Sequence, residues 1–355
     1  MTARRLLKAL ISLSLTLLLV EGAVRLTDFD KQILGDPFKD GPLLFQMYLP
    51  DSFLQWRNRP GLYLEWSGVT LNDRGYRGPD VKTVKREGVR RIAVVGDSCT
   101  FGVISIRRAA FEMPRSYAEL LQDVLDREAG PGRYEVLNYG VMGYTTYHGL
   151  RLLRRQVIHD DPDYLVIRFG WNDHLASAAL RPFSSVTNPW LEKLEDLAYG
   201  SRLYALLRYE RMPAEAVTRG GSWVPSATPI VQVTPEAYAR HLSRMIDIGR
   251  AHGTRPILLD APPAPLSPEI LADKQFLKGT GYNSYDRLIE VHAMYQAIAA
   301  RVATEKGVPF VRTEAPPGEA PRYFSRYDIA HPNAEGHARI AKFLHEKIRA
   351  MEEGE

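Results

Sequence analysis

The sequence predicts an α/β domain built around a parallel sheet that begins near residue 89. From that point on, short apolar runs alternate with segments in which apolar residues recur at helical spacing. The apolar runs are short and lack polar alternation, which is typical of strands buried on both faces. Strands that alternate with helices form parallel sheets covered by helices on both sides, so we expect that arrangement here.

The N-terminal segment precedes this pattern and is typical of a membrane-directed sequence. The run 9–20 is almost wholly apolar. The basic residues before it are Arg4, Arg5 and Lys8. A basic flank followed by an apolar core indicates a secretory signal or a signal-anchor. Neither an A-x-A cleavage site nor a lipobox cysteine follows, so we expect an uncleaved transmembrane anchor at 1–27. A cleaved signal and a buried N-terminal helix are the alternatives. The positive-inside rule then places the chain beyond about residue 28 outside the cytoplasm, in the periplasm or at the cell surface.

The segment 28–88 is irregular and rich in proline, glycine and aromatic residues. Its stretch 71–78 contains an Asn-Asp pair and glycine, which are turn-forming residues. We interpret 28–88 as a juxtamembrane arm that packs on the main domain. We expect Arg74 and Arg77 to lie at the surface or to brace the turn rather than to bind a ligand.

Five strands and five helices are expected after the arm. The first strand is a β-branched run directly before Gly96, and the others are similar short apolar runs. The first helix carries leucine and valine at helical spacing, and a later one opens with Thr234 as N-cap and Pro235 at the first helical position. The strands are expected at 91–95, 135–137, 164–167, 256–260 and 309–312. The helices are expected at 116–128, 147–159, 234–251, 285–306 and 333–351.

Residues 175–233 interrupt the alternation, so the main domain is expected at 89–351 with an insertion. The insertion contains a helix-like stretch at 190–209 and a stretch rich in glycine, serine and proline at 219–234. A long insertion of this kind forms a lid or substrate wall in some enzymes and a structural decoration in others. The sequence leaves both alternatives open.

Composition excludes several classes of function. The chain has 355 residues, a formal net charge of +4 and a single cysteine. A charge this small, without a block of like charges, argues against a nucleic-acid partner. One cysteine cannot form an intrachain disulfide, and no cysteine and histidine cluster shows zinc-like spacing. We therefore expect neither a metal ion nor another cofactor.

Four short motifs at the ends of strand-like runs supply the groups that acyl transfer needs. Ser98 follows the first strand and is the candidate nucleophile. A serine hydroxyl is a weak nucleophile that needs a base, for which His331 is the candidate. Asp328, three residues earlier, can orient the imidazole and stabilise the imidazolium. Asn333 can cap the final helix and hold this loop still.

The tetrahedral intermediate of acyl transfer also needs hydrogen-bond donors for its oxyanion. We propose the backbone N–H groups of Ser98 and Gly143 and the side-chain amide of Asn172. Loss of one such donor typically costs about 2.7–4 kcal/mol of transition-state stabilisation. Asp97 and Asp173 are interpreted as supporting residues, and Asp173 as a brace for its loop.

These motifs resemble those of the SGNH (GDSL-like) hydrolase and esterase superfamily, over roughly residues 89–350. The matching blocks are Gly96-Asp97-Ser98-Cys99-Thr100-Phe101-Gly102, Asn138-Tyr139-Gly140-Val141-Met142-Gly143, Gly170-Trp171-Asn172-Asp173 and Asp328-Ile329-Ala330-His331-Pro332. The resemblance implies a three-layer α/β/α sandwich with a five-stranded parallel sheet, of flavodoxin-like type. It also implies ester hydrolysis or acyl transfer without a metal ion. The anchor and the stretch 72–78 look like those of membrane-attached bacterial members.

Two residues depart from the pattern of the superfamily. Cys99 stands where a larger aliphatic residue is common, and we expect it to pack as a small apolar residue without a nucleophilic role. Trp171 stands where a smaller residue is common, and it forms either a pocket wall or part of the core.

A serine site together with an export signal favours a serine esterase that cleaves small acyl esters, such as O-acetyl groups on a cell-surface glycan. The same residues serve an O-acyltransferase to a polysaccharide, because only the acceptor differs between water and a sugar hydroxyl. An anchor and an aromatic arm also suit an esterase that acts on lipid (lysophospholipase-like) at the bilayer surface. A non-catalytic binding protein that keeps the fold is the remaining alternative.

Overall fold

The structure is a computed structural model of the chain. It describes residues 3–27, 45–51, 53–65, 67–82, 84–104, 115–176, 198, 201–208, 229–316 and 318–354. The chain divides into two compact units. One consists of Met1–Arg57 and Val186–Arg219, and the other of Asn58–Ser185 and Gly220–Glu355.

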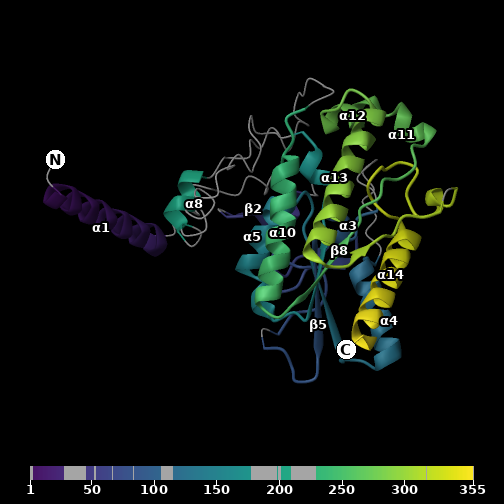
Figure 1. The fold of residues 1–355 in the computed structure, drawn as a ribbon, viewed down its shortest axis with the longest axis horizontal. Helices are drawn as coiled ribbons and strands as arrows, with labels where there is room; N and C mark the ends of the chain where they lie inside the picture. Colours follow the sequence, from purple (N-terminus) through teal and green to yellow (C-terminus); the bar gives the residue numbers. More distant parts are fainter. Residues whose placement is uncertain are drawn as a thin grey trace. The chain divides into compact units, whose positions relative to one another are not determined.

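The first unit contains one long helix, α1 (Ala3–Thr27), drawn in purple in Figure 1. Over Arg4–Thr27 this helix is long and apolar enough to cross a membrane, and most of its leucine side chains are exposed. The carboxylate of Glu21 accepts hydrogen bonds from two backbone N–H groups at the start of the short helix α8 (Arg202–Arg208). After the 3-10 turn η1 (Phe45–Met47), the strands β1 (Tyr48–Asp51) and β2 (Gln55–Asn58) form a two-stranded sheet.

The second unit is built on a five-stranded parallel sheet in the order β6-β5-β7-β8-β9. Numbered from the first of these strands, the order is that of the flavodoxin-like doubly wound fold. The predicted α/β fold is therefore confirmed. The strands are β5 (Arg90–Gly96), β6 (Tyr134–Gly140), β7 (Tyr164–Arg168), β8 (Arg255–Leu259) and β9 (Phe310–Val311).

The helices form two layers over this sheet (Figure 1). One layer consists of α4 (Tyr117–Ala129) and α14 (Ala334–Glu353), which contact each other. The other consists of α5 (Thr146–Arg155), α10 (Pro235–Ala251) and α13 (Tyr285–Lys306), in which α10 contacts both of its neighbours. The expected three-layer arrangement is therefore present.

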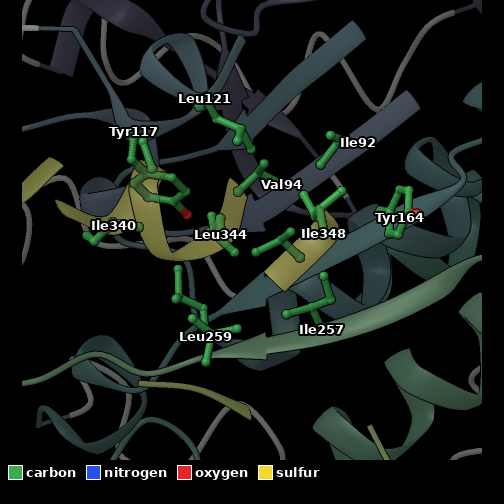
Figure 2. Packing of buried hydrophobic residues seen from close by; sticks show 14 of the residues in the cluster. Ile92, Val94, Tyr117, Leu121, Tyr164, Ile257, Leu259, Ile340, Leu344 and Ile348 are labelled. Atoms are coloured by element: carbon green, nitrogen blue, oxygen red, sulfur yellow. The ribbon is translucent and has the colours of Figure 1, made fainter. Parts of the chain in front are cut away.

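The alternation of side chains along the strands divides the apolar core between the two layers. Figure 2 shows Ile92 and Val94 of β5 packed with Leu121 of α4 and Leu344 of α14. Neighbouring strand residues point to the opposite face. Leu165 of β7 accordingly lies so close to α10 that a methyl group added at Gly249 would meet it at 3.2 Å.

The N-caps of the helices follow from the sequence. Ser116 and Glu119 form a capping box at the start of α4. Thr234 caps α10, which has Pro235 at its first position, and Asn333 caps α14, as predicted. The helix predicted at 147–159 ends earlier than expected, because Gln156 leaves the helical conformation with φ −138°. The 3-10 turn η2 (Val157–Asp160) follows it.

Several short elements were not predicted, because three to seven residues are too few to show a period. They include α3 (Ser98–Phe101), α6 (Trp171–His174), α11 (Pro268–Ala272), α12 (Lys274–Thr280) and the 3-10 turn η3 (Ala320–Arg322). Two of them, α3 and α6, begin at the motifs of the predicted site.

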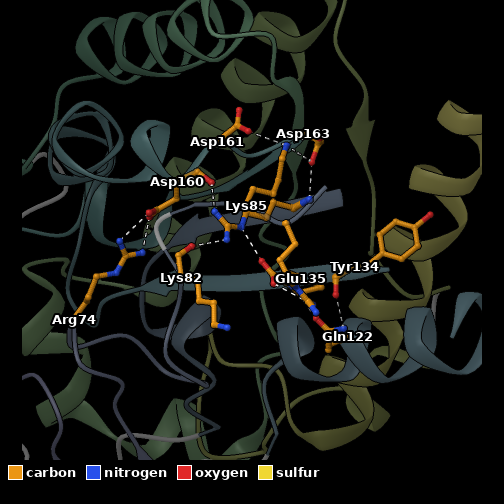
Figure 3. Close-up of polar contacts among 12 residues, drawn as sticks. Arg74, Lys82, Lys85, Gln122, Tyr134, Glu135, Asp160, Asp161 and Asp163 are labelled. Atoms are coloured by element: carbon orange, nitrogen blue, oxygen red, sulfur yellow. Dashed lines mark hydrogen bonds and ion pairs between the residues drawn. The ribbon is translucent and has the colours of Figure 1, made fainter. Parts of the chain in front are cut away.

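Charged residues before β5 brace the loops of the main sheet, after the paired strands β3 (Tyr63–Leu64) and β4 (Val69–Thr70). Figure 3 shows Arg74 paired with Asp160 at 2.6 Å and Lys85 placed between two aspartates that precede β7. Arg77 is buried and donates to the backbone carbonyl of Phe101 at 3.1 Å. Arg74 and Arg77 thus have a bracing role, and it reaches beyond their own turn.

The domain boundaries at 28–88 and 175–233 stay predictions. Residues 28–44 and most of 177–228, including the stretch predicted to be helical before residue 198, lie outside the described residues.

Candidate active site

Ser98 is the first residue of α3, directly after β5. Asp97 caps this helix, because its side chain accepts a hydrogen bond from the N–H of Cys99 at 2.9 Å. The helix ends after one turn at Gly102, whose φ of 102° is readily adopted only by glycine. The local sequence therefore turns the chain sharply at the end of the strand and holds Ser98 there.

Two glycines allow α3 to lie against the strand ends. A methyl group added at Gly96 would stand 2.0 Å from Thr100 Oγ1 and 2.6 Å from the carbonyl oxygen of Arg168. One added at Gly140 would stand 2.3 Å from the backbone nitrogen of Phe101. These separations are too short for any real Cβ atom, so the position of the Ser98 turn depends on glycine at both sites.

His331 lies on the loop before α14 and faces Ser98. Its Nε2 atom is 2.8 Å from Ser98 Oγ, and its Nδ1 atom is 2.9 Å from Asp328 Oδ2. Asp328 also accepts hydrogen bonds at Oδ1 from the backbone N–H groups of Ala330 and His331. All three predicted residues are buried, and Ser98 retains 8% of its surface. The structure therefore joins Ser98, His331 and Asp328 in one chain of hydrogen bonds.

Electrostatics fix the direction of these hydrogen bonds. Burial alone would raise the pKa of Asp328, but the adjacent His331 and the two backbone N–H groups hold its pKa below the usual value. Asp328 is then ionised at neutral pH and only accepts hydrogen bonds. The Nδ1 atom of a neutral His331 must carry the proton, which leaves Nε2 free to accept from the hydroxyl of Ser98.

The segments after the two strands that flank β5 carry Gly143, on a loop, and Asn172, in the short helix α6. The register aligns Gly96 with Gly140 of β6 and with Arg168 of β7, so the three loops leave the same edge of the sheet. Gly143 has a φ of 81° and, like Asn172, is only partly buried, whereas its neighbours in sequence are buried. Both candidate donors therefore lie at the edge of the sheet that carries Ser98.

Hydrogen bonds join these two loops to each other. Asn172 Nδ2 donates to the carbonyl oxygen of Tyr144 at 3.0 Å, which leaves the second amide hydrogen available for a ligand. Asp173 Oδ1 accepts from both the N–H and the hydroxyl of Thr146. Burial raises the pKa of Asp173 to about 7 in spite of these hydrogen bonds. Asp173 thus joins α6 to the start of α5, and its supporting role in the site stays a prediction.

A model of the GDSL-like lipase/acylhydrolase family matches residues 94–339. The chain belongs to this family. It is therefore an ester hydrolase of the GDSL type, as the four motifs predicted. The matched range contains every residue of the predicted site.

Solved structures of similar fold include further proteins described as GDSL-like or as esterases. A lipase/acylhydrolase from Enterococcus faecalis is 17% identical with a TM-score of 0.46, and the match covers 74% of this chain and 97% of that one. An acetylxylan esterase from Geobacillus stearothermophilus is 16% identical with a TM-score of 0.45, covering 75% and 96%. A GDSL-like lipase from Bacteroides thetaiotaomicron is 16% identical with a TM-score of 0.42, covering 74% and 89%. No curated protein sequence matches the chain.

The two residues that depart from the family pattern are both buried in this GDSL-like chain. The thiol of Cys99 donates to the carbonyl oxygen of Ala330 at 3.4 Å, and burial together with the neighbouring Asp97 raises its pKa. A thiol in this state is a poor nucleophile. Trp171 stacks on His292 with ring centroids 3.7 Å apart, so it belongs to the core.

Sequence reasoning missed Arg168 at the end of β7. The strand prediction stopped at residue 167 because charged residues are seldom fully buried. The structure buries Arg168 completely and places its Nη1 atom 3.8 Å from Asp97 Oδ1. Within the described residues, no group of three or more histidine, cysteine, aspartate or glutamate side chains could hold a metal ion.

Proposed function

We propose that this GDSL-like hydrolase is a serine esterase in which Ser98, His331 and Asp328 act as nucleophile, base and base-orienting residue. The proposed oxyanion donors are the N–H groups of Ser98 and Gly143 and the side chain of Asn172. The observation that carries the proposal is the pair of contacts made by the His331 ring, at 2.8 Å to Ser98 and at 2.9 Å to Asp328. Both lie within the reach that proton transfer requires.

In the first half of the reaction, Ser98 Oγ attacks the acyl carbon of the ester while His331 Nε2 takes its proton. The electron pair of the carbonyl bond moves onto oxygen, where the oxyanion donors stabilise it. The bond between the acyl carbon and the alcohol oxygen then breaks, and His331 returns the proton to the departing alcohol. Asp328 stabilises the imidazolium while it exists.

In the second half, water attacks the acyl group held on Ser98, and His331 takes a proton from that water. The bond to Ser98 Oγ breaks, His331 returns the proton to the serine oxygen, and a carboxylic acid leaves. A sugar hydroxyl in place of water would give acyl transfer through the same steps. The residues of the site therefore serve both outcomes, and the acceptor decides between them.

The proposed substrates are small acyl esters, such as O-acetyl groups on a cell-surface glycan. The proposed location outside the cytoplasm supports this class of substrate. Helix α1 is proposed to anchor the chain. The basic residues before its apolar core favour an orientation in which the second unit lies outside the cytoplasm, and we propose that orientation. Retention of the chain in carbonate-washed membranes, lost on removal of residues 1–27, tests the anchor. Digestion by protease added to spheroplasts tests the orientation.

The catalytic proposal is tested with p-nitrophenyl esters from acetate to palmitate and the full chain purified in detergent. The Ser98→Ala variant is expected to lose roughly 10⁴–10⁶-fold in kcat. The Ser67→Ala variant, with the same chemical change outside the site, should keep its activity. Turnover that survives Ser98→Ala would contradict the proposal.

The length of the acyl chain separates the remaining candidates. Fastest turnover of acetate supports small acyl groups, whereas preference for palmitate identifies a lipid-directed esterase. Hydrolysis that stays negligible while an added acetylated donor acylates a polysaccharide identifies an acyltransferase. In each case the product should require Ser98.

A further inference from the structure

Arg168 lies close to Asp97, the residue before the predicted nucleophile, in an environment that is unusual for an arginine. It is the last residue of β7, its side chain is fully buried, and none of its three guanidinium nitrogens has a hydrogen-bond partner among the described residues. A buried charge normally requires pairing or hydrogen bonds. The acidic partner that the described structure gives it is Asp97, at 3.8 Å and itself buried.

Two other polar neighbours, the Cys99 thiol and the Tyr117 hydroxyl, do not carry a compensating charge. Burial raises the pKa values of both the Cys99 thiol and the Tyr117 hydroxyl, so both groups are neutral at pH 7. A second buried acid, Asp260, also acts on Arg168 electrostatically, but its oxygens accept hydrogen bonds from Thr313 and burial raises its pKa. The ion pair of Arg168, at 3.8 Å, is with the carboxylate of Asp97. The strand register enforces this proximity, because Arg168 is aligned with Gly96, the residue before Asp97.

Asp97 needs a counter-charge because it lies next to Ser98 and caps helix α3. Its carboxylate caps α3 through the N–H of Cys99, and the next residue along the chain is Ser98. The N–H of Ser98 is a proposed oxyanion donor. Negative charge develops on the substrate oxygen in the transition state, and a buried, uncompensated carboxylate nearby would oppose it, because electrostatic effects are strong where water is excluded.

We propose that Arg168 is a positioning residue for the reaction, which neutralises Asp97 and so keeps the Ser98 turn in place without a net negative charge beneath the oxyanion. The inference rests on the proposed function of Ser98. The buried pair of Asp97 and Arg168 would then both hold the turn that carries Ser98 and balance the charge of the site.

The decisive experiment compares Arg168→Met with the double variant Asp97→Asn/Arg168→Met. The single variant removes the cation and leaves the carboxylate. The double variant removes both charges and keeps an amide oxygen that can still accept from the N–H of Cys99. We expect kcat to fall about 100-fold in the single variant, with KM changed less than about threefold, because the interaction acts in the transition state.

Recovery in the double variant distinguishes charge balance from a structural role. We expect the kcat of the double variant to be at least about tenfold higher than that of Arg168→Met. If both residues had purely structural roles, their losses of activity would add and the double variant would be slower than either single variant. Arg168→Lys, which keeps the charge, should stay within about tenfold of wild type, consistent with retained pairing. If Arg168→Met does not fold, the double variant and Arg168→Lys still decide the question.

Arg91 provides a matched control, because it is equally buried but lies at the start of β5, at the opposite edge of the sheet. Its side chain bonds Glu135 and two backbone carbonyl groups. Arg91→Met should lower Tm and leave kcat per folded molecule unchanged. A double variant as slow as Arg168→Met, or an Arg168→Met variant that loses only Tm, would overturn the inference. Turnover independent of Ser98 would instead overturn the proposed function.

Discussion

Asp173 accepts two hydrogen bonds from Thr146, one from its N–H at 2.9 Å and one from its hydroxyl at 2.5 Å. Thr146 begins α5 three residues after Gly143, and Asp173 directly follows Asn172. This contact therefore joins the loops that carry two of the proposed oxyanion donors. We therefore expect the distance between these two proposed donors to depend on the Asp173 side chain.

Replacement of Asp173 should slow the reaction without weakening substrate binding. In Asp173→Ala the N–H and hydroxyl of Thr146 lose their acceptor, and the two loops are free to separate. We expect kcat to fall roughly 100-fold with little change in KM, a loss similar to that of one oxyanion donor. Asp173→Asn keeps an acceptor oxygen and should retain most of the activity. Equal activity of the alanine variant and wild type in steady-state assays would contradict this role.

The same residue should give the protein a characteristic dependence of stability on pH. Burial raises the pKa of Asp173 from 3.8 to about 7. Between these values the folded chain keeps the proton while the unfolded chain releases it. Stability from this group is thus complete below pH 3.8 and is lost as pH rises through 7. The Tm of wild type minus that of Asp173→Asn should therefore fall from pH 4.5 to about 7 and then level off. A difference that rises over this range would refute the assignment.

Asp328→Asn should reduce turnover far more than it reduces stability. The amide can still accept at Oδ1 from the backbone N–H groups of Ala330 and His331, so the loop keeps its shape. It no longer stabilises the imidazolium or enforces the required tautomer, and we expect kcat to fall roughly 10⁴-fold. Asp286→Asn, on the exposed start of α13, is the control that should leave kcat unchanged. Steady-state kinetics at pH 7 check both variants.

The sequence predicts the parts of this structure that repeat a pattern over several residues. Helix α13 occupies the predicted range 285–306, because its apolar positions recur over six turns. Apolar runs predict the strands. The spacing of three residues between Asp328 and His331 predicts that both lie on one short loop. These features are local, so a single stretch of sequence carries all of their information.

The sequence does not reveal features that join distant segments against the usual preferences of residues. Arg168 is charged, stands at the end of an apolar run and pairs with Asp97, which lies far earlier in the chain. Arg77 bonds the carbonyl oxygen of Phe101 from a segment that precedes the whole sheet. Burial of either charge becomes favourable only after the fold supplies its partners, and no local pattern records that.

Removal of the Cys99 thiol should affect stability slightly and leave activity intact. The thiol is buried, and its hydrogen bond is to the carbonyl oxygen of Ala330, next to His331. Loss of this contact in Cys99→Ala should cost about 1 kcal/mol of unfolding free energy, measured with urea. We expect kcat to stay within about threefold of wild type, because no step of the reaction uses the thiol. Iodoacetamide should leave the native wild-type enzyme active, and rapid inactivation would indicate a nucleophilic Cys99.

Gly96→Ala should destabilise the protein and disturb the nucleophile turn together. The added methyl group would stand 2.0 Å from Thr100 Oγ1 and 2.6 Å from the backbone oxygen of Arg168, and the backbone of β7 cannot move aside cheaply. We expect a loss of about 3 kcal/mol in unfolding free energy and a lower kcat, because α3 must shift away from β5. Gly279→Ala is the matched control. It lies in helix α12 with no heavy atom within 4 Å of the added methyl group, and it should gain roughly 0.5–1 kcal/mol. Similar urea midpoints and kcat values for the two variants would show that close packing at the end of β5 does not set the position of Ser98.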